Sequence, residues 1–556
     1  MSAQTQAEVD TGIPGKRLIA STIDAQAVSR PNEAIFSIPK DASDLSKGFR
    51  DITCKSFSNA INHAAVWLVT NVGALSNAPF DAIAYSGPND LRYPILAVAA
   101  SKVGKQILFP YSLAPALVKK NMILSTGCKT LLHPTNERET AQQLLADAPH
   151  IKTVTVPELD HWLNANEIAP FPYPKSYDEG KDDPWLIFHT SGTTGFPKII
   201  TYTNRMMTSF DIAQGLPEHK EHTQLGWHSH RRCFSVVPLS HFSGLCAALQ
   251  APFFLHSIIV QGPATKAPSP RGIIETLRYS QAKGFVAPPF LLRALTQQPP
   301  ALEILKSLDY IQWIGAALDA ETGNFLSKYV KICPAMGTTE CGPYFLETAD
   351  SPKDWAYYRF QSGQGIHFEE RGDKLYELVF KKDPDAVWQQ VFSVFPDTPV
   401  YQTRDLFQPH PDKEGLWAYV GRSDDIVVLS NSANIDAASV EETISNHPSV
   451  QMGFVGGNGR ERPFLVIELT PAASEIFKEK GFEITMKEIW PVIEEANKGL
   501  SNYTRLRKEF VIITESEKGL MRNPKGSLVR AASVKKFEVE IERLCGGRVG
   551  MNHLII

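Results

Sequence analysis

The sequence predicts an α/β protein: a large N-terminal body with two sheet-bearing βαβ lobes, and a smaller C-terminal α+β domain on a hinge. The chain of 556 residues is longer than a domain with a single hydrophobic core usually is, so more than one domain is expected. Short apolar runs alternate with helix-like segments, which is typical of βαβ units and parallel sheets. The pattern changes near residue 421. We therefore assign residues 1–420 to the body and residues 421–556 to a mobile domain.

The first lobe is predicted from the alternation between residues 57 and 156. Apolar residues recur at helical spacing over 57–68, and a helical pattern also covers 91–103. Strand-like apolar runs accompany these helices at 82–85, 107–109, 130–132 and 154–156. We expect these runs to pair in one parallel sheet.

The second lobe and the C-terminal domain are predicted in the same way. Strand-like runs of a second series lie at 234–237, 257–260, 284–287 and 310–314. After residue 421, a strand-like run at 426–429 precedes a helical pattern at 438–447, and a helix at 486–500 precedes a strand at 510–514. No fixed-period repeat is visible, so a solenoid is not expected.

Composition and charge exclude several classes of function. With 43% hydrophobic and 21% charged residues, we expect a soluble globular protein, and the net charge of -4 gives no positive field for nucleic acid or a membrane surface. The seven cysteines form no CxxC pair, which argues against structural zinc and a disulfide framework. The longest apolar stretch, at 93–100, is far shorter than the roughly 20 residues of a membrane-spanning helix. A cytoplasmic location is expected.

A glycine- and hydroxyl-rich segment, FHTSGTTGFPK at 188–198, lies between strand-like runs at 185–188 and 199–202. Such a loop can bring backbone N–H groups, hydroxyls and the Lys198 ammonium onto a triphosphate. It is not a Walker loop, because Pro197 stands where that motif requires glycine and Ile199 where it requires a hydroxyl. A flexible polar turn is the alternative. The order TSGTTG followed by PK favours the phosphate loop.

This segment resembles the phosphate loop of the acyl-adenylate-forming superfamily, which comprises acyl-CoA synthetases, luciferases and adenylation domains of nonribosomal peptide synthetases. Four further motifs follow in the family's order: GTTE at 337–340, TRD at 403–405, GRSDD at 421–425 and NPKGS at 523–527. The sequences of these motifs are most similar to those in the adenylation domains of fungal synthetase-like aryl-acid reductases. The resemblance covers nearly the whole chain.

The resemblance implies ATP and Mg2+ as cofactors and assigns a role to each motif. Lys525 becomes the catalytic lysine, Asp424 the hinge pivot and Glu340 a magnesium ligand, while Asp405 accepts hydrogen bonds from the ribose and Arg422 contacts the nucleotide. The remaining nucleotide contacts implied are Thr190, Ser191, Gly192, Thr193, Thr194, Gly195, Lys198, Met336, Gly337, Thr338 and Thr339. Two residues depart from the family pattern. Met336 replaces an aromatic residue expected beside adenine, and Arg404 replaces the glycine of TGD.

The substrate class follows partly from the residues around His241, which by the resemblance is a catalytic and substrate-gating candidate. An amino-acid substrate would bring an ammonium group, which needs a paired carboxylate when buried. By the resemblance that carboxylate follows the gate, where Phe242, Ser243 and Gly244 offer none. We therefore expect an acid without an α-amino group. The family positions of the pocket are Phe242, Ser243, Gly315, Ala316, Ala317, Met336, Gly337 and Tyr344, which suit an aryl acid.

The acceptor of the acyl group and the presence of activity stay open at this point. A phosphopantetheinyl carrier domain is one acceptor and coenzyme A is the other, because no carrier-type serine motif occurs in 531–556. The main interpretation is the adenylation domain of a reductase-like synthetase, and the alternative is a free-standing aryl- or acyl-CoA ligase. An inactive nucleotide-binding scaffold is a third hypothesis. Met336 and Arg404 favour it, whereas the retained Lys198, Glu340, Asp405 and Lys525 oppose it.

Overall fold

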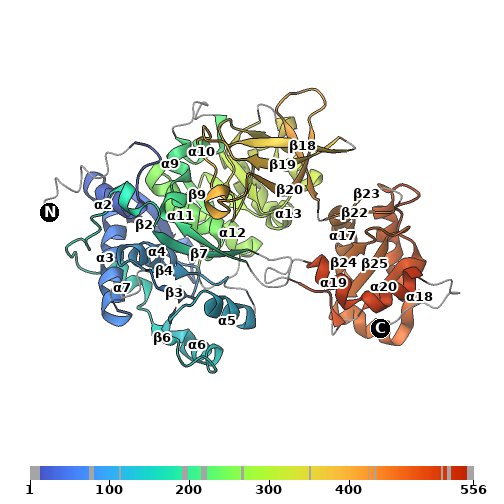
Figure 1. Cartoon of the computed structure of the whole chain (residues 1–556), viewed down its shortest axis with the longest axis horizontal. Coiled ribbons are helices and arrows are strands. Elements are labelled where there is room, and N and C mark those ends of the chain that lie inside the picture. The colour runs from blue at the N-terminus through green and yellow to red at the C-terminus, as the bar shows by residue number, and fades with distance from the viewer. Residues whose placement is uncertain are drawn as a thin grey trace.

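The structure is a computed structural model that describes residues 13–546 with short gaps. The gaps are 74–79, 112–113, 115, 191–197, 215–221, 265–267, 350–351, 373, 424, 431–433, 515–517 and 523–527. A large body extends to residue 422, and the residues from 425 onward form a smaller unit at its side (Figure 1). The predicted α/β class is confirmed, with two largely parallel sheets in the body.

The first lobe contains a six-stranded sheet in the order β6-β5-β3-β4-β7-β8. Its strands are β3 (Ala82–Tyr85), β4 (Gln106–Leu108), β5 (Thr130–His133), β6 (Lys152–Thr155), β7 (Pro184–Thr190) and β8 (Lys198–Thr203). All neighbours run parallel except β7 and β8, which are antiparallel. The helices of this lobe are α3 (Cys54–Asn71), α4 (Arg92–Lys102), α5 (Ala116–Ser125), α6 (Arg138–Leu144), α7 (Leu159–Leu163) and α8 (Tyr177–Gly180). The strands predicted in this lobe are therefore present.

The second lobe contains a seven-stranded sheet in the order β13-β12-β11-β9-β10-β1-β2. Four of the strands match the predicted runs: β9 (Arg232–Ser235), β10 (Ile258–Val260), β11 (Gly284–Ala287) and β12 (Tyr310–Ile314). The others are β13 (Lys331–Ala335), β1 (Ala34–Pro39) and β2 (Phe49–Thr53). Strand β1 pairs in parallel with β10, so the N-terminal segment completes a sheet whose other strands lie some 200 residues later. The helices are α9 (Ser209–Ala213), α10 (Gln224–His228), α11 (Phe242–Phe254), α12 (Pro270–Ser280), α13 (Pro289–Thr296), α14 (Pro299–Lys306) and α15 (Ala320–Leu326).

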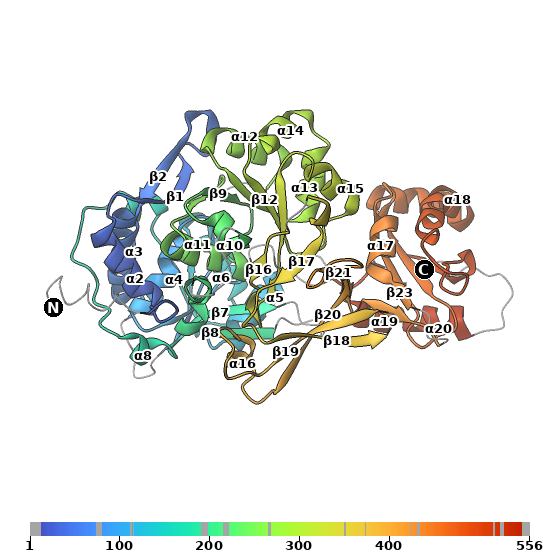
Figure 2. The ribbon, with the colours of Figure 1, turned by 90° about the horizontal axis from the view of Figure 1, so that it is seen from above.

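A third, antiparallel sheet was not predicted. Its order is β16-β17-β21-β20-β19-β18, formed by β16 (Leu346–Glu347), β17 (Tyr357–Phe360), β18 (Ile366–Gly372), β19 (Leu375–Lys381), β20 (Val400–Pro409) and β21 (Trp417–Arg422). Helix α16 (Val391–Val394) lies in the connection between β19 and β20. Strand β18 has no fully buried residue, so it carries no continuous apolar run. Figure 2 shows this sheet at the side of the body where the small unit is attached.

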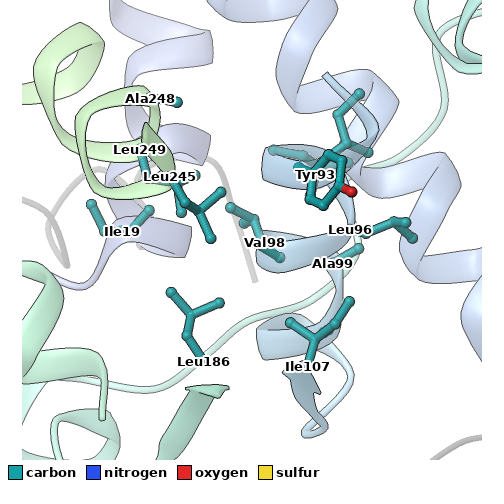
Figure 3. Packing of buried hydrophobic residues seen from close by; sticks show 14 of the residues in the cluster. Ile19, Tyr93, Leu96, Val98, Ala99, Ile107, Leu186, Leu245, Ala248 and Leu249 are labelled. Atoms are coloured by element: carbon teal, nitrogen blue, oxygen red, sulfur yellow. The ribbon is translucent and has the colours of Figure 1, made fainter. Parts of the chain in front are cut away.

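The core of the first lobe packs against helix α11, which contributes residues to the candidate site. Helix α4 is buried around its whole circumference, as expected for a helix that is apolar on every face. Figure 3 shows Val98 of α4 on the side of Leu245 of α11 and Leu186 of β7, with Ile19 of α2 (Ile19–Ser29) next to Leu245, and Leu96 on the opposite side of α4. Helix α11 is thereby anchored in the body.

A buried ion pair lies inside this apolar core. The ammonium of Lys102 in α4 is 2.7 Å from both carboxylate oxygens of Asp24 in α2, and it donates to Asn62 Oδ1 in α3 at 3.0 Å. The Lys102 side chain is 0% exposed and that of Asp24 is 5% exposed. Each charge is therefore tolerated only because the other is present.

The C-terminal unit has its own core and a small sheet. The sheet has the order β24-β25-β26, with β24 (Val450–Gly456), β25 (Phe464–Leu469) and β26 (Val511–Thr514). The hairpin of β22 (Ile426–Val428) and β23 (Asn434–Asp436) precedes them, and the helices are α17 (Ala437–Ser445), α18 (Pro471–Asn497), α19 (Arg530–Lys536) and α20 (Glu538–Gly546). Helix α18 changes direction at Gly481, where φ is 73°. The predicted α+β content is confirmed.

Two arginines pair with helix α17 of the small unit, one from within the unit and one from the body. Arg530 of α19 pairs with Glu441 of α17 at 2.7 Å and with Asp425 at 2.9 Å, next to the predicted hinge position. Arg293 of α13 pairs with Glu442 of α17 at 2.6 Å, which ties the body to the small unit. Within the described ranges, no helix combines the length and the apolar character that crossing a membrane requires.

We predict that Lys102→Met destabilises the body strongly. The substitution leaves the Asp24 carboxylate buried without its cation, and breaking such a pair costs about 3–5 kcal/mol of unfolding free energy. Urea unfolding followed by circular dichroism measures it. The control is Lys47→Met, which removes a pair with Asp41 at the surface and leaves the unfolding curve nearly unchanged. Equal unfolding curves for Lys102→Met and the wild type would contradict the prediction.

Candidate active site

One cavity of about 620 Å³ lies where the second-lobe sheet meets α11 and the third sheet. Strands β9, β12 and β13 end at its wall, as is usual for ligand sites of parallel sheets. The structure brings together here most of the predicted residues that it describes: His241, Phe242, Ser243, Gly315, Ala316, Ala317, Met336, Gly337, Thr338, Thr339, Glu340, Tyr344, Asp405 and Arg422. Segments more than 150 residues apart thus share one site.

Asp405 and Arg422 meet because their strands are paired. Asp405 of β20 lies directly opposite Arg422 of β21 in the antiparallel register, and Arg422 Nη1 is 3.5 Å from Asp405 Oδ1. The Asp405 residue is 4% exposed, and its backbone N–H donates to Thr403 Oγ1 at 3.0 Å. The guanidinium holds a nearly buried carboxylate at the cavity wall. Glu340 brings a second carboxylate to the same cavity.

Arg404 adopts the backbone conformation that favours glycine. Its φ is 66°, in the left-handed region that L-residues with a side chain rarely adopt. The neighbouring contacts hold it there: its N–H donates to Glu377 Oε1 at 3.0 Å and its carbonyl accepts from Ser423 N–H at 2.7 Å. The strand therefore keeps a backbone conformation that favours glycine directly before Asp405, although the residue is arginine.

A tight hairpin carries the GTTE segment. Strand β14 (Gly337–Thr338) pairs with β15 (Gly342–Pro343), and a Cβ atom on Gly337 would lie 2.6 Å from the Gly342 carbonyl oxygen. No side chain fits there. The hydroxyl of Tyr202 in β8 donates to the Thr339 carbonyl at 2.7 Å, so the first lobe holds the hairpin of the second.

His241 is the N-cap of α11. Its Nδ1 accepts from Ser243 N–H at 3.4 Å and is 2.8 Å from Ser243 Oγ, which orients the ring at the cavity. The next residue, Phe242, is buried and packs edge-on against Phe188 and Tyr202, with ring centroids 5.5 and 5.3 Å apart. The apolar contacts of Phe242 thus position the histidine.

The remaining predicted residues are not brought into the cavity by the described part of the chain. The Lys198 ammonium lies 4.1 Å from the Phe395 ring centroid and is not among the cavity's lining groups. Thr190 pairs with Lys198 through the backbone register of β7 and β8, so the two frame the phosphate-loop segment, but the Thr190 side chain lies outside the described residues. Outside them too lie Ser191, Gly192, Thr193, Thr194, Gly195, Asp424 and Lys525.

The carboxylate of Glu340 fits a magnesium ion that is shared with phosphate groups. The described residues contain no cluster of three or more metal-binding side chains. Magnesium is commonly held by one or two carboxylates together with substrate phosphates, rather than by a cage of protein ligands. Glu340, which lines the cavity, offers such an oxygen donor.

Several lining residues were missed by sequence reasoning. They are Gln224 and His228 of α10, Ser235 of β9, Gln312 of β12 and Tyr419 of β21. One signal was present, because Gln312 is a polar residue inside the otherwise apolar run YIQWI. The residues of α10 gave none, since their partners lie more than 80 residues away.

Comparison with known proteins identifies the family. The model of the AMP-binding enzyme family matches residues 23–364, and that of the AMP-binding enzyme C-terminal domain matches residues 424–546. The chain therefore belongs to the AMP-binding enzyme family, and it is an adenylate-forming enzyme.

Its relatives and structural neighbours are consistent with that family. A carboxylic acid reductase from Neurospora crassa is 29% identical over 539 residues, covering 95% of this chain and 51% of that protein. An adenylate-forming reductase from Serpula lacrymans var. lacrymans is 27% identical, with 96% and 50% covered. The chain thus spans about half the length of both relatives. The structure of o-succinylbenzoate coenzyme A synthetase from Bacillus subtilis with AMP has a TM-score of 0.66 at 17% identity, over 92% of this chain and 97% of that one.

We predict that Tyr202→Phe loosens the GTTE hairpin. Loss of the hydroxyl leaves the Thr339 carbonyl without its donor, which costs about 1–3 kcal/mol of unfolding free energy. The melting temperature falls, and the dissociation constant for ATP rises because the hairpin borders the cavity. Thermal unfolding and calorimetric ATP titration measure the two effects. Tyr279→Phe, on an exposed face of α12, is the control; a Tyr202→Phe protein that behaves like this control would refute the prediction.

Proposed function

We propose that the protein transfers AMP from ATP to an aryl acid without an α-amino group, releasing pyrophosphate. The observation that carries the proposal is the single cavity that joins Asp405, Arg422 and the GTTE hairpin to the predicted acid pocket at Phe242 and Gly315. Nucleotide and acid would therefore meet in one cavity. The names of the reductase relatives support the same chemistry.

The reaction joins two anions. A carboxylate oxygen of the acid attacks the α-phosphorus of ATP, and the bond between that phosphorus and the bridging oxygen breaks as pyrophosphate leaves. Such a transfer depends mainly on positioning and on neutralising charge in the transition state. The protein must therefore supply cations and N–H donors around the phosphates.

The residues divide this work between them. Thr190 to Gly195 and Lys198 bind the outer phosphates, while Thr338 and Thr339 bind near the α-phosphate. Asp405 accepts hydrogen bonds from the ribose, and Arg422 pairs with that carboxylate and holds it in place. Met336 and Gly337 lie against the adenine and the acid. His241, held by Ser243, closes the pocket beside the reacting carboxylate.

Magnesium fits beside Glu340. When bound with ATP, the ion neutralises charge on the pyrophosphate that leaves. Glu340 provides an oxygen donor at the cavity, and phosphate oxygens complete the set of ligands.

We propose that residues 421–556 turn about Asp424 between two half-reactions. In the first, Lys525 reaches the reacting carboxylate; in the second, another face of this unit admits the thiol that takes the acyl group. The thiol would be the phosphopantetheine of a carrier domain, as in a reductase-like synthetase. The chain's coverage of about half of its reductase relatives supports this assignment. Coenzyme A is the alternative thiol.

ATP–pyrophosphate exchange with a panel of benzoic, fatty and amino acids tests the proposal. We expect exchange with benzoic acids and none with amino acids. Product analysis then compares coenzyme A with a phosphopantetheinylated carrier protein as acceptor. Failure of every acid to support exchange would overturn the proposed activity, whereas transfer to coenzyme A alone would replace the carrier by the free thiol.

We predict that Lys525→Ala separates rate from binding. Removal of one group that stabilises transition-state charge lowers rates by about 10²–10³-fold. Acyl-adenylate formation should therefore fall by at least that factor while the dissociation constant for ATP stays close to the wild-type value. Asp405→Asn provides the contrast, because it weakens ATP binding directly. An unchanged single-turnover rate for Lys525→Ala would show that the lysine has no catalytic role.

A further inference from the structure

The inner wall of the cavity is one face of the second-lobe sheet. Ser235, Val286 and Gln312 lie side by side in the parallel register of β9, β11 and β12, and all three line the cavity. Side chains alternate between faces along a strand, so the neighbours Phe285 and Ile311 point the other way, into an apolar cluster. The cavity face is therefore apolar except for the hydroxyl of Ser235 and the amide of Gln312.

Helix α10 adds a directed chain of hydrogen bonds to this wall. Gln224 Nε2 donates to the Pro334 carbonyl, which can only accept. Gln224 Oε1 therefore accepts from Gln312 Nε2 at 3.2 Å, and Gln312 Oε1 accepts from His228 Nε2 at 2.9 Å. His228 Nδ1 then accepts from the Tyr310 hydroxyl at 2.9 Å. Burial lowers the pKa of His228, which keeps the ring in the neutral form that this chain requires.

The hydrogen-bonded chain leaves N–H and O–H groups of the wall that it does not use. One lone pair of the Gln312 oxygen accepts from the imidazole, and each glutamine amide uses one of its two N–H groups in the chain. The Cys333 thiol, which is only a weak acceptor, contacts the Gln312 amide. Ser235 Oγ accepts from Val237 N–H at 3.3 Å and keeps its own O–H to donate. A ring oxygen placed here is a stronger acceptor than the thiol, whereas an apolar group offers these donors no acceptor, at a cost comparable to a lost hydrogen bond.

The distance along β12 places this wall at the far end of a bound acid. Gln312 precedes Gly315 at the strand end by three residues, which is about 10 Å at the rise of a strand. Gly315 and the GTTE hairpin border the side where the carboxylate would meet the nucleotide. The ring of a single aromatic acid spans this interval, so its distal edge would face Gln312 and Ser235.

We propose that the inner wall, through Gln312 with Ser235, selects aryl acids that carry a hydroxyl oxygen on the ring edge distal to the carboxylate. This inference rests on the proposed function and names the substrate class within it. The oxygen accepts a hydrogen bond from the Gln312 amide, and His228 is a positioning residue that fixes which end of that amide faces the ring. Benzoic acids with a methyl group at the same place fill the space but leave the donors unpaired.

The test compares acids of nearly equal size in ATP–pyrophosphate exchange. The probes are 3- and 4-hydroxybenzoate, 3- and 4-methylbenzoate, and benzoate. With the wild-type protein, we expect kcat/KM for the better hydroxybenzoate to exceed that of its methyl counterpart at least tenfold. A site built around a hydroxyl rejects the analogue that lacks it, because its own polar groups are left unpaired.

Gln312→Leu keeps the size of the side chain but removes the donor. We expect the hydroxyl-to-methyl ratio to fall to about one, mainly through loss of activity with the hydroxy acid. Ile314→Val is the matched control, because Ile314 lies on the same strand and the same face and lines the same cavity. It should keep the wild-type ratio. Activity with the methyl acid reports whether Gln312→Leu is folded, and Ser235→Ala is the second variant.

The possible outcomes distinguish a failure of the hydroxyl selection from a failure of the proposed adenylation activity. A wild-type protein that uses methyl- and hydroxybenzoates equally would overturn the hydroxyl selection while adenylation stands. An unchanged hydroxyl-to-methyl ratio of kcat/KM in both Gln312→Leu and Ser235→Ala would also overturn that selection. The chain of hydrogen bonds would then serve only to hold α10 on the sheet. No exchange with any of the acids would overturn the proposed function, and the inference with it.

Discussion

Parallel strands share one direction, so the segments that follow them all leave from the same edge of the sheet. In the second lobe this constraint gathers the ends of β9, β12 and β13, and the GTTE hairpin and the residues of the proposed acid pocket follow from that edge. The third sheet then closes the cavity with Asp405 and Arg422, and α11 brings His241. The core beneath α11 fixes the position of His241, and the strand register fixes the positions of Asp405 and Arg422.

The parallel lobes were predictable because buried strands leave a strong signal. A strand covered on both faces is a continuous apolar run, as in β3 and β11, whose residues are all buried. The third sheet gave no such signal, since strands such as β18 are half polar and exposed. The addition of β1 to the second lobe was equally hidden, because pairing over some 200 residues leaves no local pattern.

The site was predictable only as far as motifs reach. The motifs at 337–340, 403–405 and 422 contain residues that line one cavity. Arg404 departs from the motif, but its backbone is in the left-handed region that favours the glycine of the motif. The inner wall was not predictable, because Gln224, His228 and Gln312 belong to no motif and meet only in the folded chain. The Lys198 ammonium lies over the Phe395 ring, and its contact with the phosphates stays a prediction.

The ion pair of Arg293 with Glu442 has a consequence for how the two parts of the molecule sit together. Both side chains reach solvent, with exposed fractions of 33% and 57%, so dissolved ions screen their attraction over a Debye length of about 8 Å at physiological ionic strength. The proposed turn of the small unit would break this contact, whereas the pairing of Arg530 with Glu441 lies within that unit and would survive. Salt concentration would then shift the balance between the two proposed orientations by weakening this one contact.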